Sequence, residues 1–351
     1  MLKNVITLSV LALAWSNMIF AQQDRHFSMW MENPTLLNPA TSGVMNEDIR
    51  FMTNMRMQWL PLNGENFRTN SFGFDAKLMK NKSGSHLGIG LNFVNDATGD
   101  LRLTSNIVSV PISYTIAADK NTFISLGIAP GFYQQAIKNT NSTWNNQWDG
   151  ATYNQTTLSG EGFSPELAVS TFDIGAGLHV NYKFDASNNI NVGISVNHIT
   201  APLVSYSALE NKLYRNVNIY VTGSRFMDDR NFGLSPQVLV SLYGPNRNIL
   251  FGTYFDHEMF ESSKRTDYVQ RSFISYGVFM RWGDAIVGSL TYKFKGFKVG
   301  ASYDFNISEL SSATRTSGGF EIFLKFSTMT DRSSYIHDRK LFRWNRGTRR
   351  L

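Results

Sequence analysis

Apolar side chains recur at every second residue along most of this chain, from about residue 48 to residue 328. In the stretch FKVGASYDFN, Phe297 and Val299 fall on one face while Lys298 and Asp304 fall on the other. A period of two places successive side chains on opposite sides of a β-strand, whereas a helix needs a period of 3.6. The alternation therefore predicts an all-β fold of long strands.

Fourteen runs of this kind follow one another, near residues 48–59, 67–80, 86–96, 101–117, 122–138, 165–184, 190–199, 214–227, 232–243, 248–259, 267–282, 286–295, 297–308 and 317–328. Most are about ten residues long or more, as a tilted strand needs to cross a bilayer. An even number of strands returns both termini to one side, which we expect to be the periplasm. If the first strand runs outward, the long connectors 60–66, 139–164, 200–213 and 309–316 lie outside, although 260–266 is long for an inner turn.

The strands of a soluble β-sandwich also alternate between apolar and polar residues. Three features favour instead an antiparallel transmembrane β-barrel of about 14 strands. The inward positions carry mainly Gly, Ser, Asn and Thr, which suit a lumen. The predicted strands are about ten residues long or more, as a tilted membrane span requires. Aromatic residues recur near strand ends, as in membrane-interface girdles; they are Tyr114, Phe132, Tyr133, Tyr182, Phe184, Trp282, Tyr292, Phe294 and Phe326. Because backbone groups in lipid must be paired within the protein, the sheet is predicted to close on itself.

The first 21 residues have the pattern of an export signal. Lys3 supplies a positive charge, residues 5–15 are apolar, and Ala21 is a plausible last residue before cleavage. The chain has no cysteine, which excludes disulfides and thiol-bound zinc. We therefore divide the chain into a signal peptide (1–21), an N-terminal periplasmic or interior segment (22–47), the barrel (48–328) and a basic periplasmic tail (329–351).

The C-terminal tail carries most of the excess positive charge. Its 23 residues hold seven basic and two acidic groups, a net charge of +5, and the whole chain is +6. Large apolar side chains lie between these charges, which is unusual for a purely solvated tail, the alternative reading. We expect the tail to bind a periplasmic partner, and no nucleic acid, through Arg332, Arg339, Lys340, Phe342, Arg343, Trp344, Arg346, Arg349 and Arg350.

The sequence shows no recognisable catalytic or metal-binding pattern. Its six histidines are scattered, and Asp256, His257 and Glu258 are neighbours on one strand, where successive side chains point to opposite faces. It has no G-x-S-x-G nucleophile elbow and no phosphate-binding glycine loop. We therefore expect no enzyme activity, no metal and no cofactor.

The stretch NPTLLNPATSG, residues 33–43, precedes the first strand. Each of its two prolines removes a backbone donor, and the asparagine before each can close a turn through its side chain. The stretch is therefore expected to be too broken for a helix or a strand. Leu36 and Leu37 need burial, and the nearest shelter is the barrel interior or its inner mouth. The stretch is predicted to be an ordered plug; a flexible leader is the alternative.

A longer stretch, QQDRHFSMWMENPTLLNPATSG, spans residues 22–43. It resembles the N-terminal signature of the PorP/SprF family of the type IX secretion system. The matching residues are Asp24, Phe27, Ser28, Met31, Asn33, Pro34, Asn38, Pro39, Ala40 and Gly43, and the departures are Arg25, Met29 and Trp30. Further on, the family's Arg-x-Gln-Trp and Phe-x-Phe-Asp motifs are matched by Arg56, Gln58 and Trp59, and by Phe72, Phe74 and Asp75.

The resemblance implies an outer-membrane component or accessory of type IX secretion. Such proteins help to export or surface-anchor large adhesin-like cargo, including gliding adhesins, and contact the periplasmic ring or motor complex and outer-membrane lipids. Trp144 and Trp148, in connector 139–164, are expected to form an exposed anchor for cargo or glycan, unless they pack on the loop itself. Two alternatives stay open: a transporter of small apolar solutes, and a porin.

Overall fold

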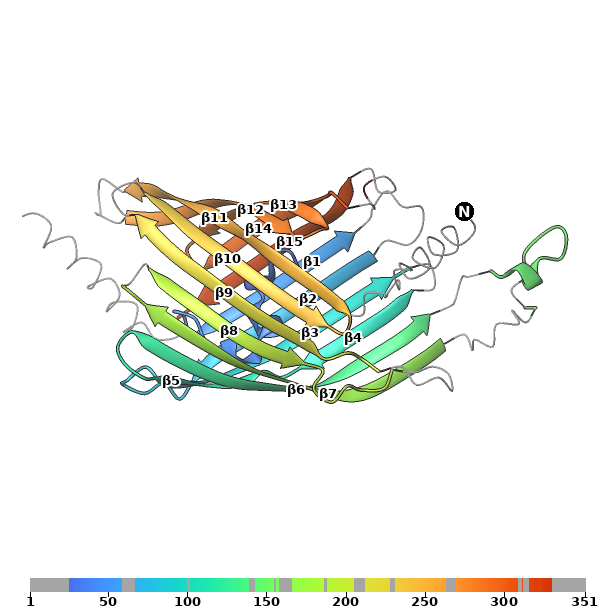
Figure 1. The fold of residues 1–351 in the computed structure, drawn as a ribbon, viewed down its shortest axis with the longest axis horizontal. Coiled ribbons are helices and arrows are strands. Elements are labelled where there is room, and N and C mark those ends of the chain that lie inside the picture. Colours follow the sequence, from blue (N-terminus) through green and yellow to red (C-terminus); the bar gives the residue numbers. More distant parts are fainter. Residues whose placement is uncertain are drawn as a thin grey trace, which may run out of the picture.

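The computed structural model describes residues 25–58, 67–99, 102–138, 143–154, 156–157, 166–185, 188–204, 212–227, 231–262, 269–308, 311 and 316–329. These residues form fifteen β-strands in a single sheet (Figure 1). The strands are β1 (Ile49–Gln58), β2 (Phe67–Leu78), β3 (His86–Thr98), β4 (Leu103–Ser109), β5 (Ile112–Ala117), β6 (Thr122–Lys138), β7 (Glu166–Lys183), β8 (Asn189–Asn197), β9 (Asn216–Met227), β10 (Phe232–Tyr243), β11 (Asn246–Ser262), β12 (Val269–Arg281), β13 (Ala285–Phe294), β14 (Phe297–Asn306) and β15 (Ser317–Thr328).

The sheet closes on itself, as the alternation predicted. β1 pairs antiparallel with β2 on one side and with β15 on the other, and Ile49 lies opposite Thr328. The first and last residues of the barrel therefore lie at the same end, which we call the terminal rim. The opposite end carries the longest connector, between Lys138 and Glu166, and we call it the loop rim.

One predicted strand, over residues 101–117, is divided into β4 and β5. Both pieces pair with β3 and with β6, so they form one span interrupted at Val110 and Pro111. The break has a simple cause, because proline has no N–H for the ladder. Backbone bonds still bridge it: the N–H of Gly90 donates to the Pro111 carbonyl (2.8 Å), and the N–H of Val110 to the Pro130 carbonyl (2.9 Å). Counting β4 and β5 together, the fifteen strands make fourteen spans.

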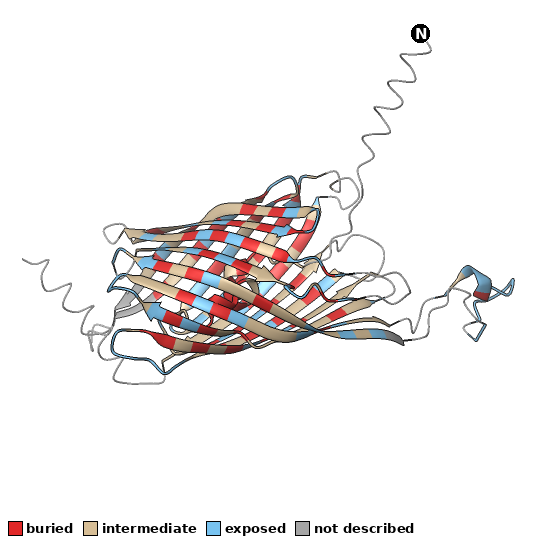
Figure 2. Ribbon diagram, turned by 60° about the horizontal axis from the view of Figure 1, so that its bottom comes forward, coloured by how far each residue is buried: buried red, intermediate tan, exposed pale blue. Residues whose placement is uncertain are grey.

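Apolar side chains cover the outside of the barrel and polar ones line its inside. Figure 2 shows buried and exposed residues alternating along the strands. In β14, for example, Phe297 is exposed while Ser302 and Asp304 are buried. An apolar outer surface is what lipid requires of a barrel. Tyr133 corrects the expected aromatic girdle: its neighbour Phe132 is exposed, but Tyr133 is buried and faces the lumen, since neighbours on a strand point opposite ways.

Before β1 the chain makes three single turns, η1 (Trp30–Glu32), α2 (Pro34–Leu37) and η2 (Pro39–Thr41). The turn α2 corrects the expectation that this stretch is too broken for any helix. Asn38 joins α2 to η2: its N–H donates to the Pro34 carbonyl, and its side-chain oxygen accepts the Ala40 N–H at 2.9 Å, the side-chain turn predicted there. Asn33 makes no such cap. None of the helices in the described part of the chain is long and apolar enough to span a membrane.

Candidate functional site in the barrel lumen

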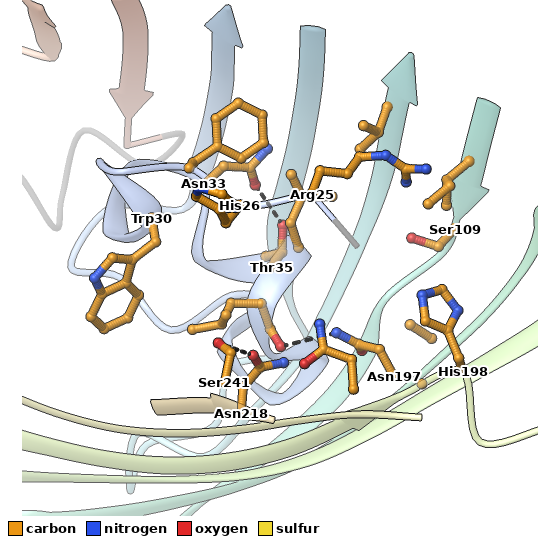
Figure 3. Close-up of a pocket in the computed structure, with 18 of the residues that line it drawn as sticks. Arg25, His26, Trp30, Asn33, Thr35, Ser109, Asn197, His198, Asn218 and Ser241 are labelled. Atoms are coloured by element: carbon orange, nitrogen blue, oxygen red, sulfur yellow. Dashed lines mark hydrogen bonds between the residues drawn. The ribbon is translucent and has the colours of Figure 1, made fainter. Parts of the chain in front are cut away.

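Residues 25–48, which we call the luminal segment, contact inward-facing side chains of strands all round the barrel. Figure 3 shows its turns facing the barrel strands, with Asn33 and Thr35 on the segment and Asn218 and Ser241 on the wall. The contacts are of three kinds: buried ion pairs, apolar packing and close backbone approach. Together they determine how firmly the segment is held.

Ser28 lies in a buried cluster of four charges, which we call the arginine–carboxylate cluster. The Ser28 hydroxyl accepts hydrogen bonds from Arg56 Nη1 (2.8 Å) and Arg281 Nη2 (2.6 Å) and donates to Asp304 Oδ1 (2.9 Å). Its backbone N–H donates to Glu321 Oε2 at 2.8 Å. The two guanidinium groups pair with the carboxylates, at 2.6 Å between Arg56 and Asp304 and 3.0 Å between Arg281 and Asp304. Because these residues come from β1, β12, β14 and β15, the cluster spans the seam where the barrel closes.

Glu32 forms a second buried anchor between two lysines of the wall. Lys298 and Lys325 are direct cross-strand partners on β14 and β15, and like charges in this arrangement repel. Glu32 Oε1 lies 2.6 Å from Lys298 Nζ, and Glu32 Oε2 lies 2.7 Å from Lys325 Nζ. Burial alone would raise the pKa of the Glu32 carboxyl, but the two ammonium groups outweigh burial and lower this pKa to about 2. Glu32 is therefore ionised at neutral pH and bridges both lysines, which reduces their mutual repulsion.

A third anchor holds the end of the luminal segment just before β1. Arg50 and Asp75 face each other across β1 and β2 and form a bidentate pair, with distances of 2.9 and 2.8 Å. Asp75 Oδ2 also accepts the Gly43 N–H at 2.7 Å, and Arg50 Nη2 donates to the Thr41 carbonyl at 3.3 Å. Bidentate arginine–carboxylate pairs fix geometry as well as charge. The chain therefore enters β1 in a defined position.

Apolar contacts hold the middle of the luminal segment. Trp30 packs against Tyr220 with a ring-centroid distance of 5.3 Å, and Met31 and Leu37 pack against the same buried cluster. The wall residues of this cluster are Tyr220, Leu239, Leu250, Tyr254, Phe279 and Val287. Most inward positions elsewhere are polar, so this patch is the part of the wall that accepts the segment's large side chains.

Two wall glycines let the backbone of the segment approach the strands closely. A Cβ added to Gly127 would lie 2.5 Å from the amide nitrogen of Ala40, and one added to Gly88 would overlap the carbonyl of Ser42. Nearby, the Asn38 side chain donates to the Leu178 carbonyl at 3.0 Å. Any side chain at Gly88 or Gly127 would push the segment away from the wall.

The predicted luminal residues are distributed as follows. Ser28, Asn33, Pro34, Asn38, Pro39, Ala40, Gly43 and Arg56 are buried, while Phe27, Met31, Leu36, Leu37 and Gln58 are partly buried. That the segment closes the lumen stays a prediction.

In the connector between β6 and β7, Trp144 is partly buried, and Trp148 is half exposed and packs on Tyr153 with a ring-centroid distance of 5.0 Å. The predicted signal peptide (1–21), Trp59 and the tail from residue 330 onward lie outside the described residues.

Six anchoring residues were not predicted as site residues from the sequence. They are the segment residue Glu32 and the wall residues Lys298, Lys325, Arg281, Asp304 and Glu321. A signal was present, because Lys298 and Asp304 occupy inward positions of the alternating pattern. A charge inside a closed lumen needs a partner. Their partners could not be identified without the strand register, since Ser28 and Asp304 are 276 residues apart.

The family described as type IX secretion system membrane protein PorP/SprF matches residues 19–326. No curated protein sequence matches the chain.

Similar solved structures include the Ralstonia pickettii toluene transporter TbuX, with a TM-score of 0.48 and 11% identity over 84% of this chain and 93% of that chain. A Pseudomonas aeruginosa FadL homologue has a TM-score of 0.42 and 10% identity over 83% and 92% of the two chains. Because the family match covers the luminal segment and nearly the whole barrel, the chain belongs to the PorP/SprF family of type IX secretion system membrane proteins.

Proposed function

We propose that this protein is an accessory of the type IX secretion system that assists the export or surface anchoring of a large adhesin-like cargo. The family match over residues 19–326 carries this proposal. The same family and the closed β-barrel identify an outer-membrane protein. In this proposal it acts by binding its partners and performs no catalysis.

The luminal contacts support a docking role over a diffusion pore. Ser28, Glu32 and Asp75 take part in buried ionic contacts between the segment and strands β1, β2, β12, β14 and β15. Breaking such a pair leaves an uncompensated buried charge, which typically costs about 3–5 kcal/mol. A segment held at three places stays in the lumen and narrows it, as suits a protein whose partners bind at its two rims.

The proposal assigns the loop rim to the cell surface and the terminal rim to the periplasm. The half-exposed Trp148 then faces cargo, and the basic tail (329–351) meets the periplasmic ring or motor complex. An epitope tag inserted at Asn145 tests this orientation. It should bind antibody on intact cells, and labelling only after permeabilisation would reverse the assignment.

Deletion of the gene in its native host tests the function itself. We expect the adhesin-like cargo to disappear from the cell surface and to return with a plasmid copy, while the levels of other outer-membrane proteins stay unchanged. Normal surface cargo in the deletion strain would contradict the proposal. If uptake of a hydrocarbon such as toluene failed instead, the transporter alternative would be correct.

A further inference from the structure

Three lysines form a row on the inner wall near the terminal rim, and we call them the lysine row. Lys293 on β13 is the direct cross-strand partner of Lys298 on β14, which in turn is the partner of Lys325 on β15. Directly opposed residues have Cβ atoms about 5 Å apart, and like charges in this arrangement destabilise a sheet. Two such pairs adjoin here, so the lysine row gains stability from any carboxylate that lies against it.

The luminal segment supplies one carboxylate to the lysine row. Glu32 bridges Lys298 and Lys325, at distances of 2.6 and 2.7 Å from their ammonium groups. No carboxylate of the described residues lies within ion-pair distance of Lys293. The pair formed by Lys293 and Lys298 thus has the same cross-strand arrangement as the bridged pair, but it has no carboxylate of its own.

Lys293 points into the barrel and is open to solvent. Strand alternation places it on the same face as Thr291, which is 1% exposed, and opposite to Tyr292, which is 41% exposed on the outside. Lys293 is itself exposed, because it stands at the end of β13, one residue before Phe294. On the outside the same hairpin presents Tyr292 and Phe297, which suit lipid. An anion that reaches Lys293 therefore comes through the mouth of the barrel and is not a lipid head group.

Aromatic side chains border Lys293 on the side away from Lys298. Phe273 on β12 is the cross-strand partner of Lys293, and the Phe273 ring lies 6.0 Å from the Phe226 ring on β9, between centroids. Because β9 and β12 are not neighbouring strands, both rings face the lumen. The inward carboxylates of β11, which belong to Asp256 and Glu258, are two strands or about 10 Å from Lys293. The wall next to this ammonium group is therefore apolar.

We infer that Lys293 and Lys298 bind a carboxylate of an acidic peptide segment that enters through the mouth at the terminal rim. An ammonium group has three donors, and Lys298 uses one of them on Glu32. A second carboxylate can therefore bridge Lys293 and Lys298 as Glu32 bridges Lys298 and Lys325, while a neighbouring apolar side chain packs on Phe273. The basic tail follows β15 at the same rim, so one acidic partner fits both. The inference deepens the proposed function, on which it rests for the source of the peptide, a periplasmic partner.

Acetylation of lysines in the purified, folded protein tests the inference. The rate at which each lysine reacts with N-hydroxysuccinimide acetate is measured by mass spectrometry, alone and with three probes. The probes are the blocked peptide N-acetyl-Gly-Glu-Leu-Glu-Gly-amide, its glutamine counterpart, and sodium acetate at the same carboxylate concentration. We expect the glutamate peptide at about 5 mM to slow the acetylation of Lys293 about sixfold, as a Kd of about 1 mM gives. The other two probes should change this rate little.

Three other lysines of the same rim locate the contact. Lys82 is exposed in the connector between β2 and β3, and its acetylation rate should not respond to the peptide. Lys298→Gln removes half of the site and should reduce the protection of Lys293 to less than about twofold. Lys295→Gln is the matched control, since it makes the same change at an exposed position in the turn of the same hairpin, and it should leave the protection unchanged. If Lys298→Gln does not fold, the two peptides compared on the parent protein decide, since that comparison needs no variant.

The inference is overturned if the glutamate peptide does not protect Lys293, if the glutamine peptide or acetate protects it as well, or if Lys82 is protected to the same extent. Equal loss of protection in Lys295→Gln and Lys298→Gln would overturn it too. Because the measurement involves no secretion, such a result together with lost cargo in the deletion strain would remove the peptide site and leave the proposed function intact.

Discussion

Lys298 and Lys325 face each other across β14 and β15, and their ammonium groups contact the two oxygens of one carboxylate, that of Glu32. The wall of the barrel thus places two like charges side by side, and the luminal segment bridges them. At the arginine–carboxylate cluster the segment contributes hydrogen bonds and no charge: the Ser28 hydroxyl accepts from both Arg56 and Arg281. The luminal segment therefore contributes charge and hydrogen bonds to the strands where the barrel closes.

Glu32→Gln should destabilise the barrel, because it leaves two opposed lysines without a counter-charge. We expect a loss on the order of 3 kcal/mol in the free energy of unfolding at pH 7, measured by urea unfolding in lipid vesicles. Glu47→Gln, a change of the same kind at a partly exposed position, is the control and should have little effect. Equal stabilities of Glu32→Gln and the parent protein would show that the bridge contributes nothing.

The stability difference between the parent protein and Glu32→Gln should also depend on pH. The pKa of Glu32 is about 2 in the folded protein and near its ordinary value of 4.5 when unfolded, so the ionised form stabilises the fold. This contribution is complete above about pH 4.5 and is lost as the pH falls towards 2. The difference in unfolding free energy between the parent and Glu32→Gln should therefore shrink to nearly zero across this range. A difference that stays constant from pH 7 to pH 2 would contradict the assignment.

Asp304→Asn should be among the most damaging single changes in the barrel. It leaves Arg56 and Arg281 buried with Glu321 and the more exposed Asp284 as the remaining counter-charges, and breaking a buried pair typically costs about 3–5 kcal/mol. Asp284→Asn is the matched control, since Asp284 also contacts Arg281, at 3.2 Å, but its side chain is 38% exposed. Its effect should stay below about 1 kcal/mol. Heat-modifiable mobility in detergent compares the two variants directly, and equal loss would argue against a special role for the cluster.

Gly127→Val should displace the luminal segment, because the added side chain would collide with the backbone at Ala40. Gly288→Val is the control, since no atom lies within 4 Å of the Cβ position there. A single cysteine at the buried position of Ser42 reports the displacement. Its thiol should react at least about tenfold faster in the Gly127→Val background, whereas the Gly288→Val background should behave like the parent. Unchanged reactivity in both would mean that the segment is not held by this close approach.

The C-terminal tail is predicted to bind a periplasmic partner without contributing to barrel stability. Strand β15 ends at Thr328, so deletion of residues 331–351 leaves every ladder pair of the described strands intact. The truncated protein should insert and resist heat as before but lose its periplasmic partner and cargo secretion. Its charges should steer the encounter over about 8 Å at physiological salt, while its aromatic side chains hold the complex. Co-purification of the partner measures this, and full retention of the partner would refute the docking role.

The spans were predictable from sequence because alternation is a local signal. The predicted run 122–138 coincides with β6, and the run 317–328 with β15. The break at Pro111 could also have been predicted from the sequence, because proline has no N–H to donate to the neighbouring strand. The anchors were not, because they join residues that are far apart in the chain, such as Arg56 and Asp304, 248 residues apart. Their pairing depends on strand register and barrel closure, which no local pattern specifies.

We propose that the luminal segment is a fixed part of the barrel, in which case the protein does not act as a diffusion pore. Planar-bilayer conductance of the purified protein tests this most directly. The parent should show no steady open channel. Replacing Leu36 and Leu37 by Asp introduces two charges into partly buried positions and should open a leak, since unpaired charges oppose burial. A steady open channel in the parent protein, unchanged by the double substitution, would contradict the account.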